Sequence, residues 1–321
     1  MPLLVADTYR APGYLWNSHA ETIVPSLFRN VNGIQYTRER LELTDGDFLD
    51  LDWLCGGHRK LVIISHGLEG SSERHYCKGA AKYFFLCGWD ALAWNCRGCS
   101  GEINRLPRFY HHGATDDLKA VVDYALTKAY DSVALIGFSL GGSLTIKYIG
   151  ENKGKLPSEV RAAATFSVPC DLGSSARQLD LPGGAFYRKR FLNKLKKKVE
   201  MKARRMPGQI TAAHFQHIRT FEDFDNYYTA PLHGFADAQD FYAKASCGNY
   251  LPDVSVPLLL LSAANDPFLP EACYPKAVAA AHPYVYLQIT RKGGHVGFTL
   301  RGTEANWMEL RAFEFISDHI R

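Results

Sequence analysis

Short hydrophobic runs recur along the chain and alternate with longer segments of helical periodicity. Six of these runs have the length and composition of strands that are buried on both faces. They span residues 61–65, 91–95, 133–137, 162–168, 258–262 and 285–290. Helical patterns at about 73–86, 116–129 and 140–150 separate the first four runs, and another lies at 304–320. This alternation predicts a mostly parallel, doubly wound α/β sheet.

The chain before the first of these runs has a different pattern. Residues 34–43 and 48–53 alternate apolar and polar side chains on either side of the sequence Thr-Asp-Gly-Asp at 44–47. Alternation of this kind around a glycine-containing turn is typical of a hairpin. The sheet is therefore expected to open with antiparallel strands.

The rhythm of strand and helix stops after Val168 and resumes only at Val256. A structureless loop of that length is improbable inside a compact domain, and this stretch contains many aromatic residues and several helical patterns. We predict an α/β core made of residues 1–169 and 251–321, and an inserted, mainly helical lid made of residues 170–250.

Composition excludes some classes of protein. The 321 residues are 46% hydrophobic and 22% charged, unlike a disordered or collagen-like chain. The net charge of +4 is too small to suggest nucleic acid, but residues 188–205 alone hold ten basic residues and one acid. This basic segment has two interpretations. It is either a solvated helical face, or a patch that contacts an anionic membrane or a phosphorylated substrate.

The expected compartment is the cytoplasm. The first sixteen residues lack a basic segment followed by an apolar run, and no apolar stretch reaches 18 residues, so we expect neither a signal peptide nor a transmembrane helix. Eight cysteines are too few in a chain of this size to form a disulfide framework.

The strongest chemical signal is the pentapeptide Gly-Phe-Ser-Leu-Gly at 137–141, between an apolar strand and a helical run. A serine on a sharp turn from strand to helix needs small neighbours at both ends, and Gly137 and Gly141 supply them. This context predicts that Ser139 is a nucleophile rather than part of a packing turn. The Leu140 N–H, at the start of the helix, is expected to stabilise an oxyanion.

A serine hydroxyl needs an oriented imidazole to accept its proton, and the acid and the histidine follow the serine in this kind of fold. Asp266 comes directly after the run at 258–262, and His295 follows the run at 285–290. Taken singly, each could be an ordinary loop residue. Three residues at three strand ends, in this order, predict a Ser139–Asp266–His295 triad.

The remaining site predictions concern the loop after the first buried run and the pentapeptide itself. The Leu68 N–H, beside the small Gly67, is the candidate for the second oxyanion donor. His66 is expected to have a structural role, and Phe138 to contact substrate.

Two weaker signals have alternative interpretations. Cys96 and Cys99 form a Cys-x-x-Cys pair, and a redox function would require a reversible disulfide between them. The pair follows a strand deep in the chain, and this position disfavours a redox function. His111 and His112 could bind a metal, yet no second set of ligands has the right spacing, which favours a polar loop. No metal or cofactor is expected.

Motifs spread over nearly the whole chain resemble one branch of the α/β-hydrolase superfamily, the YheT-like hydrolases. The motifs lie at residues 16–25, 66–68, 95–101, 110–113 with Asp116 and Asp117, 228–232 with 234–235, 265–268 and 293–298. Relatives in this branch include medium-chain fatty acid ester synthases and esterases, and membrane-bound phospholipases. The resemblance implies that Ser139, Asp266 and His295 form the charge relay and that residues 97–101 form a structural loop.

The sequence therefore predicts a serine hydrolase that cleaves carboxylic esters with short- to medium-length acyl chains, bound under the aromatic lid. Two alternatives stay open: transfer of the acyl group to an alcohol, and a non-catalytic module that sits on a lipid surface. The expected partners are a small-molecule or lipid ester and, through residues 188–205, a membrane surface. Nucleic acid is not expected.

Overall fold

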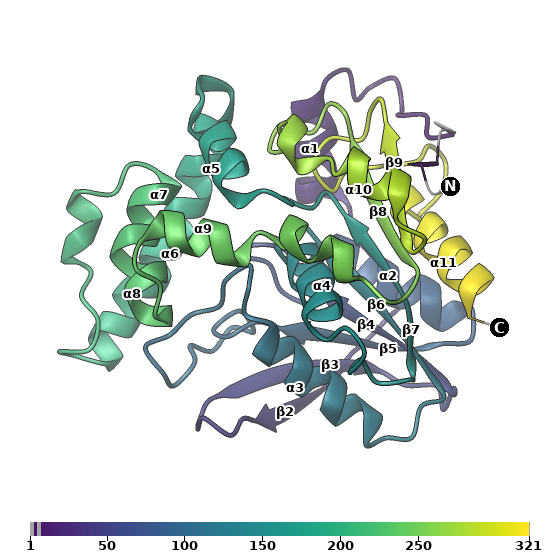
Figure 1. Ribbon diagram of the computed structural model, residues 1–321, viewed down its shortest axis with the longest axis horizontal. Coiled ribbons are helices and arrows are strands. Elements are labelled where there is room, and N and C mark those ends of the chain that lie inside the picture. The colour runs from purple at the N-terminus through teal and green to yellow at the C-terminus, as the bar shows by residue number, and fades with distance from the viewer. Residues whose placement is uncertain (1–2, 5–7, 321) are drawn as a thin grey trace.

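The computed structural model is described for residues 3–4 and 8–320 (Figure 1). Residues 1–2 and 5–7, which belong to the N-terminal segment where we expect no signal peptide, lie outside these ranges. Within the described ranges, nine strands form one sheet in the order β1-β9-β8-β7-β6-β4-β5-β3-β2. The α/β fold class predicted from the sequence is confirmed.

The buried hydrophobic runs form the parallel part of the sheet. The strands are β1 (Leu3–Leu4), β2 (Thr37–Glu42), β3 (Phe48–Leu54), β4 (Lys60–Ser65), β5 (Asp90–Asn95), β6 (Ser132–Phe138), β7 (Val160–Phe166), β8 (Leu258–Ala263) and β9 (Val285–Thr290). Within the described residues only the pairs β2–β3 and β3–β5 are antiparallel, and the hairpin pattern predicted the first of them. The carboxyl ends of β4, β6, β8 and β9 therefore lie along one edge.

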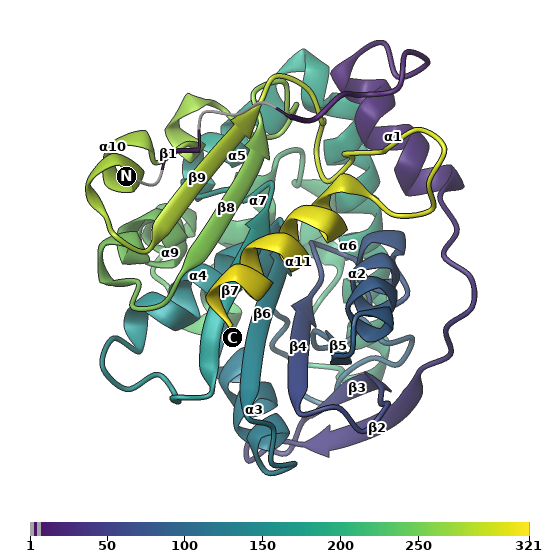
Figure 2. The same ribbon diagram turned by 90° about the vertical axis from the view of Figure 1, so that its right-hand side faces the viewer.

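Helices cover both faces of the sheet. On one face, α2 (His75–Leu86) and α11 (Trp307–His319) pack on the strands, as Figure 2 shows for α11. The other face is covered by α3 (Thr115–Leu126), α4 (Leu140–Glu151) and α10 (Lys276–Ala281). The sequence did not predict α10, nor α1 (Ser18–Phe28), which has Pro25 in its interior.

The stretch between β7 and β8 is helical, and it lies beyond the edge of the sheet where β4 and β6 end (Figure 1). It contains α5 (Leu172–Asp180), α6 (Ala185–Arg205), α7 (Phe221–Phe224), α8 (Ala230–His233) and α9 (Ala238–Ala245). Its hydrophobic cluster includes residues of the predicted core, Phe109 and Phe268. We keep the name lid for residues 170–250, and the division into core and lid stays a prediction.

The basic segment is part of α6, and one side of it is not solvated. Lys198 and Lys202 are buried: the Lys198 ammonium lies 2.6 Å from Glu69 Oε1, and Lys202 donates to the backbone oxygens of residues 106–108. A spacing of four residues places both on one face of the helix. The interpretation of the basic segment as a solvated helical face is therefore wrong for the side of α6 that carries Lys198 and Lys202. Other basic residues of the segment, Lys189, Lys196 and Lys197, are exposed to solvent.

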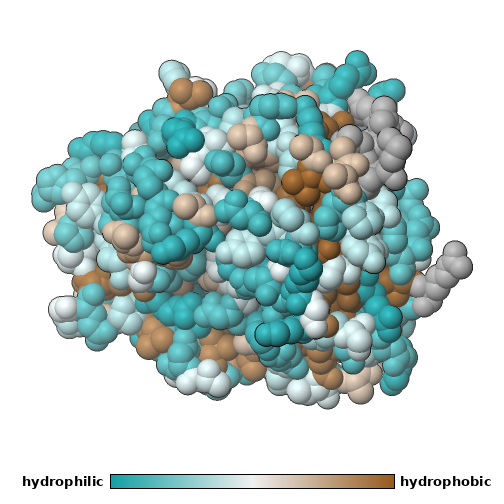
Figure 3. Space-filling view, viewed as in Figure 1, coloured by the Kyte–Doolittle hydropathy of each residue, from teal (hydrophilic) through white to brown (hydrophobic). Residues whose placement is uncertain are grey.

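Within the described ranges, no helix combines the length and the apolar character needed to cross a bilayer. The face of the molecule in Figure 3 is mostly hydrophilic, with hydrophobic residues in small, separate groups.

Candidate active site

Ser139 stands on a strained turn between β6 and α4. Its backbone angles are φ 52° and ψ −115°, a region that residues other than glycine rarely adopt. A methyl group on Gly137 would collide with the Gly141 backbone, and one on Gly141 would collide with the Ser65 carbonyl. The two glycines therefore let the turn pack against β4, as their positions in the sequence predicted. Strain of this kind is often found at functional sites.

The structure brings Ser139, His295 and Asp266 together in one hydrogen-bonded chain. His295 Nε2 lies 3.0 Å from Ser139 Oγ, and His295 Nδ1 lies 2.9 Å from Asp266 Oδ2. The Asp266 carboxylate is buried and also accepts from the Phe268 N–H at 2.8 Å. The Phe268 ring stacks on the imidazole with 4.0 Å between ring centroids. These contacts fix the imidazole between the hydroxyl and the carboxylate.

Two residues of α1, for which sequence analysis predicted no role, hold the loops that carry the acid and the histidine. Thr22 Oγ1 accepts from the His295 N–H at 2.9 Å. The buried Glu21 carboxylate accepts from the Gly293 N–H at 2.7 Å and from the Asn265 side chain at 2.9 Å. In the sequence, the only signal for these two positioning residues is that they lie in the motif at 16–25, which carries part of the family resemblance.

Leu68 and Leu140 are the residues predicted to donate the two N–H groups of an oxyanion hole. Both line the same pocket as Ser139 and His295. Within the part of the chain that the structure describes, neither backbone N–H has a hydrogen-bond acceptor. A methyl group on Gly67 would lie 3.3 Å from Ser139 Cβ, so this loop passes directly beside the nucleophile. His66 is buried, contacts the Gly67 carbonyl at 2.7 Å and accepts from the Cys96 N–H at 3.1 Å, which is a structural arrangement.

The expectation that Phe138 contacts substrate is wrong. Phe138 is buried against Tyr76 and Phe166, with ring centroids at 4.7 and 5.2 Å, and it belongs to the cluster under α2 and α11. Because side chains alternate along a strand, Phe138 shares a face with Ala134 and Ile136, which faces away from the lid.

The pocket above Ser139 is apolar and has a volume of about 960 Å³, its open mouth included. Lid residues on its wall include Leu172, Ala176, Leu179, Phe191, Leu195, Phe221, Phe224 and Phe241. His111 and His112 also line it, and burial lowers the pKa of both, to about 4 for His112, so neither imidazole is charged near neutral pH. This pocket, which we call the apolar pocket, suits an uncharged chain.

Asp225 is the carboxylic acid in the wall of the apolar pocket, at the start of a π-helical turn. Burial raises its pKa from 3.8 to about 7. The unfolded chain therefore loses this proton at lower pH than the folded chain, so the stability that Asp225 contributes falls as pH rises from about 4 to about 7. Between pH 5 and 8 we expect the unfolding free energy to drop by roughly 2 kcal/mol more in the wild type than in Asp225→Asn, measured by urea titration. Parallel pH profiles for the two proteins would contradict this.

The Cys-x-x-Cys pair forms a turn, not an exposed dithiol. The Cys99 N–H donates to the Cys96 carbonyl at 2.9 Å, and Lys198 Nζ lies 3.3 Å from Cys99 Sγ. Burial raises the pKa of both thiols, which lowers their reactivity. Nothing in this geometry favours redox chemistry. Across residues 3–4 and 8–320, no group of three His, Cys, Asp or Glu side chains could hold a metal ion.

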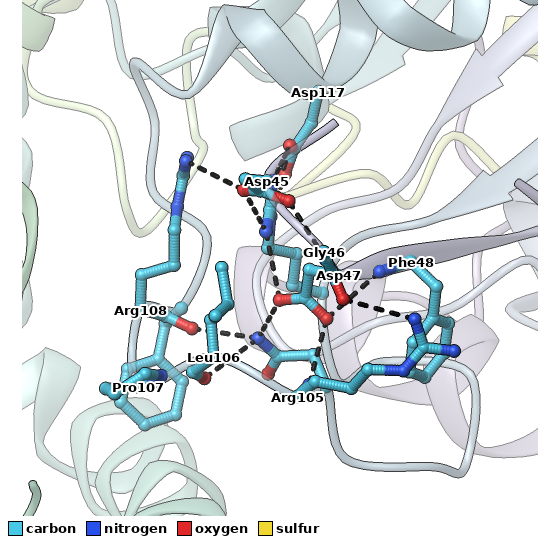
Figure 4. A network of polar contacts seen from close by, with 12 residues as sticks. Asp45, Gly46, Asp47, Phe48, Arg105, Leu106, Pro107, Arg108 and Asp117 are labelled. Carbon is cyan, nitrogen blue, oxygen red and sulfur yellow. Dashed lines mark hydrogen bonds and ion pairs between the residues drawn. The ribbon is translucent and has the colours of Figure 1, made fainter. Parts of the chain in front are cut away.

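Arg97, which lies between the two cysteines, anchors the loop at 97–101. It is buried and lies 2.8 Å from Asp45, 2.9 Å from Asp47 and 2.7 Å from Asp117, carboxylates that converge in Figure 4. Asp47 also accepts from the Arg105 N–H at 2.9 Å. The loop is therefore held by buried charge pairs, in agreement with the structural role that the family resemblance implied.

Comparison with known families places this architecture. Residues 60–301 match the family model described as alpha/beta hydrolase fold. The chain belongs to the alpha/beta hydrolase fold family. The match begins at β4 and ends after the loop of His295, so it includes all three residues of the hydrogen-bonded chain.

Alignments with individual relatives cover most of this chain. YheT of Escherichia coli (strain K12), provisionally named an esterase, is 33% identical over 95% of this chain and 91% of the relative. The phospholipase ABHD3 of Mus musculus is 29% identical over 92% of this chain and 74% of the relative. The solved structure of the Pyrococcus furiosus esterase Pf2001 has a TM-score of 0.60 and 18% identity, covering 91% of this chain and 97% of that one. The relatives' names agree with the prediction of an ester hydrolase, and the solved structure agrees in fold.

Proposed function

We propose that the protein is a serine hydrolase that cleaves carboxylic esters of short- to medium-length acyl chains. The observation that carries the proposal is the chain of hydrogen bonds from Asp266 through His295 to Ser139, which opens into the apolar pocket. The esterase and phospholipase names of the relatives support the same class of reaction.

The chemistry follows from the positions of these groups. Ser139 Oγ attacks the ester carbonyl carbon while its proton passes to His295 Nε2, and Asp266 stabilises the imidazolium through Nδ1. The Leu68 and Leu140 N–H groups donate to the oxyanion of the tetrahedral intermediate. When the intermediate collapses, the alkoxide leaves with the proton from His295, and the acyl group stays on Ser139.

The second half of the reaction uses the same groups in reverse. A water molecule gives its proton to His295 Nε2 and attacks the acyl carbonyl carbon. The second tetrahedral intermediate releases the carboxylic acid as the proton returns to Ser139 Oγ. During both halves the apolar chain stays among the lid residues, which removes its surface from water and favours binding by about 25 cal/mol per Å².

A panel of 4-nitrophenyl esters tests the proposal. We expect kcat/KM to be largest for acyl chains of about four to eight carbons, because the apolar pocket is closed by the lid on one side. Ser139→Ala should abolish the activity. Ser143→Ala, which removes a buried hydroxyl one helical turn away that has no hydrogen-bond partner in the described structure, should leave it unchanged.

Two results would contradict the proposal. Release of 4-nitrophenol at the same rate by the wild type and Ser139→Ala would exclude Ser139 as the nucleophile. A kcat/KM that keeps rising to sixteen carbons would exclude the chain-length preference. Addition of a primary alcohol, followed by analysis of the products, shows whether water or the alcohol takes the acyl group.

A further inference from the structure

A second pocket meets the apolar pocket at the nucleophile. It shares Leu68, Ser139, Phe191, Phe268 and His295 with the apolar pocket and has a volume of about 750 Å³, its open mouth included. From Ser139 it extends between α1 and the first turns of α6 and α2. An ester bound at Ser139 has two halves, so each pocket can take one of them.

Three cationic side chains line this second pocket: Arg74, Arg190 and Lys194. Arg74 donates to Ser26 Oγ at 2.8 Å, and Lys194 donates to the Glu69 carbonyl at 3.0 Å. Neither contact is with a carboxylate, and none of the three cations is in an ion pair in the described part of the chain. We call Arg74, Arg190 and Lys194 the cationic subsite.

The acid beside these cations is already neutralised. Among the described residues that line the second pocket, Glu69 is the one carboxylic acid. Glu69 Oε1 lies 2.6 Å from the buried Lys198 ammonium and accepts from the Tyr110 hydroxyl at 2.7 Å. Its charge is therefore committed to Lys198, and the cationic subsite keeps an excess of positive charge next to the nucleophile.

The first turn of α2 faces the same pocket and adds to this charge. This turn has neither an acidic residue nor a side-chain cap, so its free N–H groups carry the positive end of the helix dipole.

We propose that the second pocket binds the alcohol half of the ester and that the cationic subsite recognises an anionic group, a phosphate or a carboxylate, on that half. This inference rests on the proposed function, because it assigns the two halves of the substrate of the same site. Guanidinium groups bind such oxyanions through paired, charge-assisted hydrogen bonds. An anion would also relieve the mutual repulsion of three cations in a partly enclosed site.

The contrast between the two pockets sets the orientation of the substrate. The apolar pocket has neutral imidazoles and a carboxyl whose raised pKa keeps it largely protonated below pH 7, so it offers nothing to an anion. Burial and the charge of Arg74 lower the pKa of Lys194, the Glu69 charge opposes this in part, and the charges of Arg190 and Lys198 lower it further. An anionic group would offset this electrostatic cost. The acyl chain therefore occupies the apolar pocket, and the charged half occupies the cationic subsite.

A set of soluble hexanoyl esters with matched acyl groups tests this. The set comprises 1-hexanoylglycerol, 1-hexanoylglycerol 3-phosphate, 1-hexanoylglycerol 3-phosphocholine and O-hexanoyl glycolate, which separate neutral, phosphate, zwitterionic and carboxylate alcohols. We expect kcat/KM for the phosphate or the carboxylate ester to exceed that for 1-hexanoylglycerol by roughly tenfold or more at low salt, and this ratio to fall as salt is added. Whichever of the two anions shows the larger ratio identifies the group that the subsite prefers.

Variants on α6 assign the preference to the cationic subsite. Arg190 is partly exposed and has no hydrogen bond in the described structure, so Arg190→Gln and Arg190→Glu should fold. We expect Arg190→Gln to lower the ratio of anionic to neutral kcat/KM and Arg190→Glu to bring it to one or below. Lys197→Gln, which removes an exposed charge from the same helix, should leave the ratio unchanged.

A binding measurement separates failure of this inference from failure of the proposed function. Calorimetry with Ser139→Ala should detect glycerol 3-phosphate binding that glycerol does not show, and that Arg190→Glu in the Ser139→Ala background abolishes. Ester cleavage that depends on Ser139 but has no anionic preference would overturn the inference and leave the proposed function standing. If none of the four esters is cleaved, the proposed function fails, and the presence or absence of glycerol 3-phosphate binding alone decides whether the cationic subsite binds anions.

Discussion

Replacement of Asp266 by Asn is expected to lower kcat for ester hydrolysis by about 10⁴-fold while the fold is kept. The Asn side chain can still accept from the Phe268 N–H, but its amide group would face His295 Nδ1, which is 2.9 Å from the carboxylate in the wild type. His295 would then turn its unprotonated nitrogen towards the amide and lose the tautomer that accepts the Ser139 proton. The uncharged amide would also fail to stabilise the imidazolium.

Steady-state kinetics on the preferred 4-nitrophenyl ester measure this loss, with circular dichroism to confirm folding. Asp123→Asn is a matched control, because Asp123 is on the exposed side of α3 and, among the described residues, forms an ion pair only with Lys119. A folded Asp266→Asn protein that retains more than about a tenth of wild-type kcat would show that Asp266 does not orient His295.

Replacement of Arg97 by Leu is expected to lower the free energy of unfolding by about 3 to 5 kcal/mol. Arg97 is 2% exposed and lies within 3 Å of three carboxylates, of which Asp47 and Asp117 are fully buried. Without the guanidinium, Asp47 and Asp117 would be buried without the ion pairs that they make in the wild type. The cost would arise from their desolvation and mutual repulsion, because leucine fills much of the space that the arginine stem occupied.

Urea unfolding measures this effect against a matched exposed pair. Arg59 is 68% exposed and pairs with Asp131, so Arg59→Leu should cost less than about 1 kcal/mol. Equal losses for the two variants would mean that the buried cluster contributes no more than a surface ion pair, and that the loop at 97–101 is held by other contacts.

Local sequence patterns predicted the parts of the molecule that local physics determines. Strands buried on both faces need continuous apolar runs, so their positions were visible in the sequence. Once the strands are placed, parallel pairing brings their carboxyl ends to one edge, and Ser139, Asp266 and His295 meet there. The turn at Ser139 needed a special sequence as well, with glycine at 137 and 141.

Contacts between distant segments were not predictable in this way. Thr22 meets the loop of His295 from the far end of the chain, and Lys202 is buried only because residues 106–108 present their carbonyls to it. Alternation along β6 places Phe138 on the same face as Ile136. Both faces of this strand are buried under helices, so the sequence alone did not show which face lies away from the lid.

The most direct test of the account is to treat the purified protein with a fluorophosphonate and to locate the adduct by peptide mass spectrometry. The account predicts one stoichiometric adduct, on Ser139, that is lost in Ser139→Ala and retained in Ser143→Ala, because among the described serines only Ser139 has its hydroxyl beside an oriented imidazole, at 3.0 Å. Failure to label a folded wild-type protein, or an adduct on another serine that persists in Ser139→Ala, would contradict the central claim that Ser139 is an activated nucleophile.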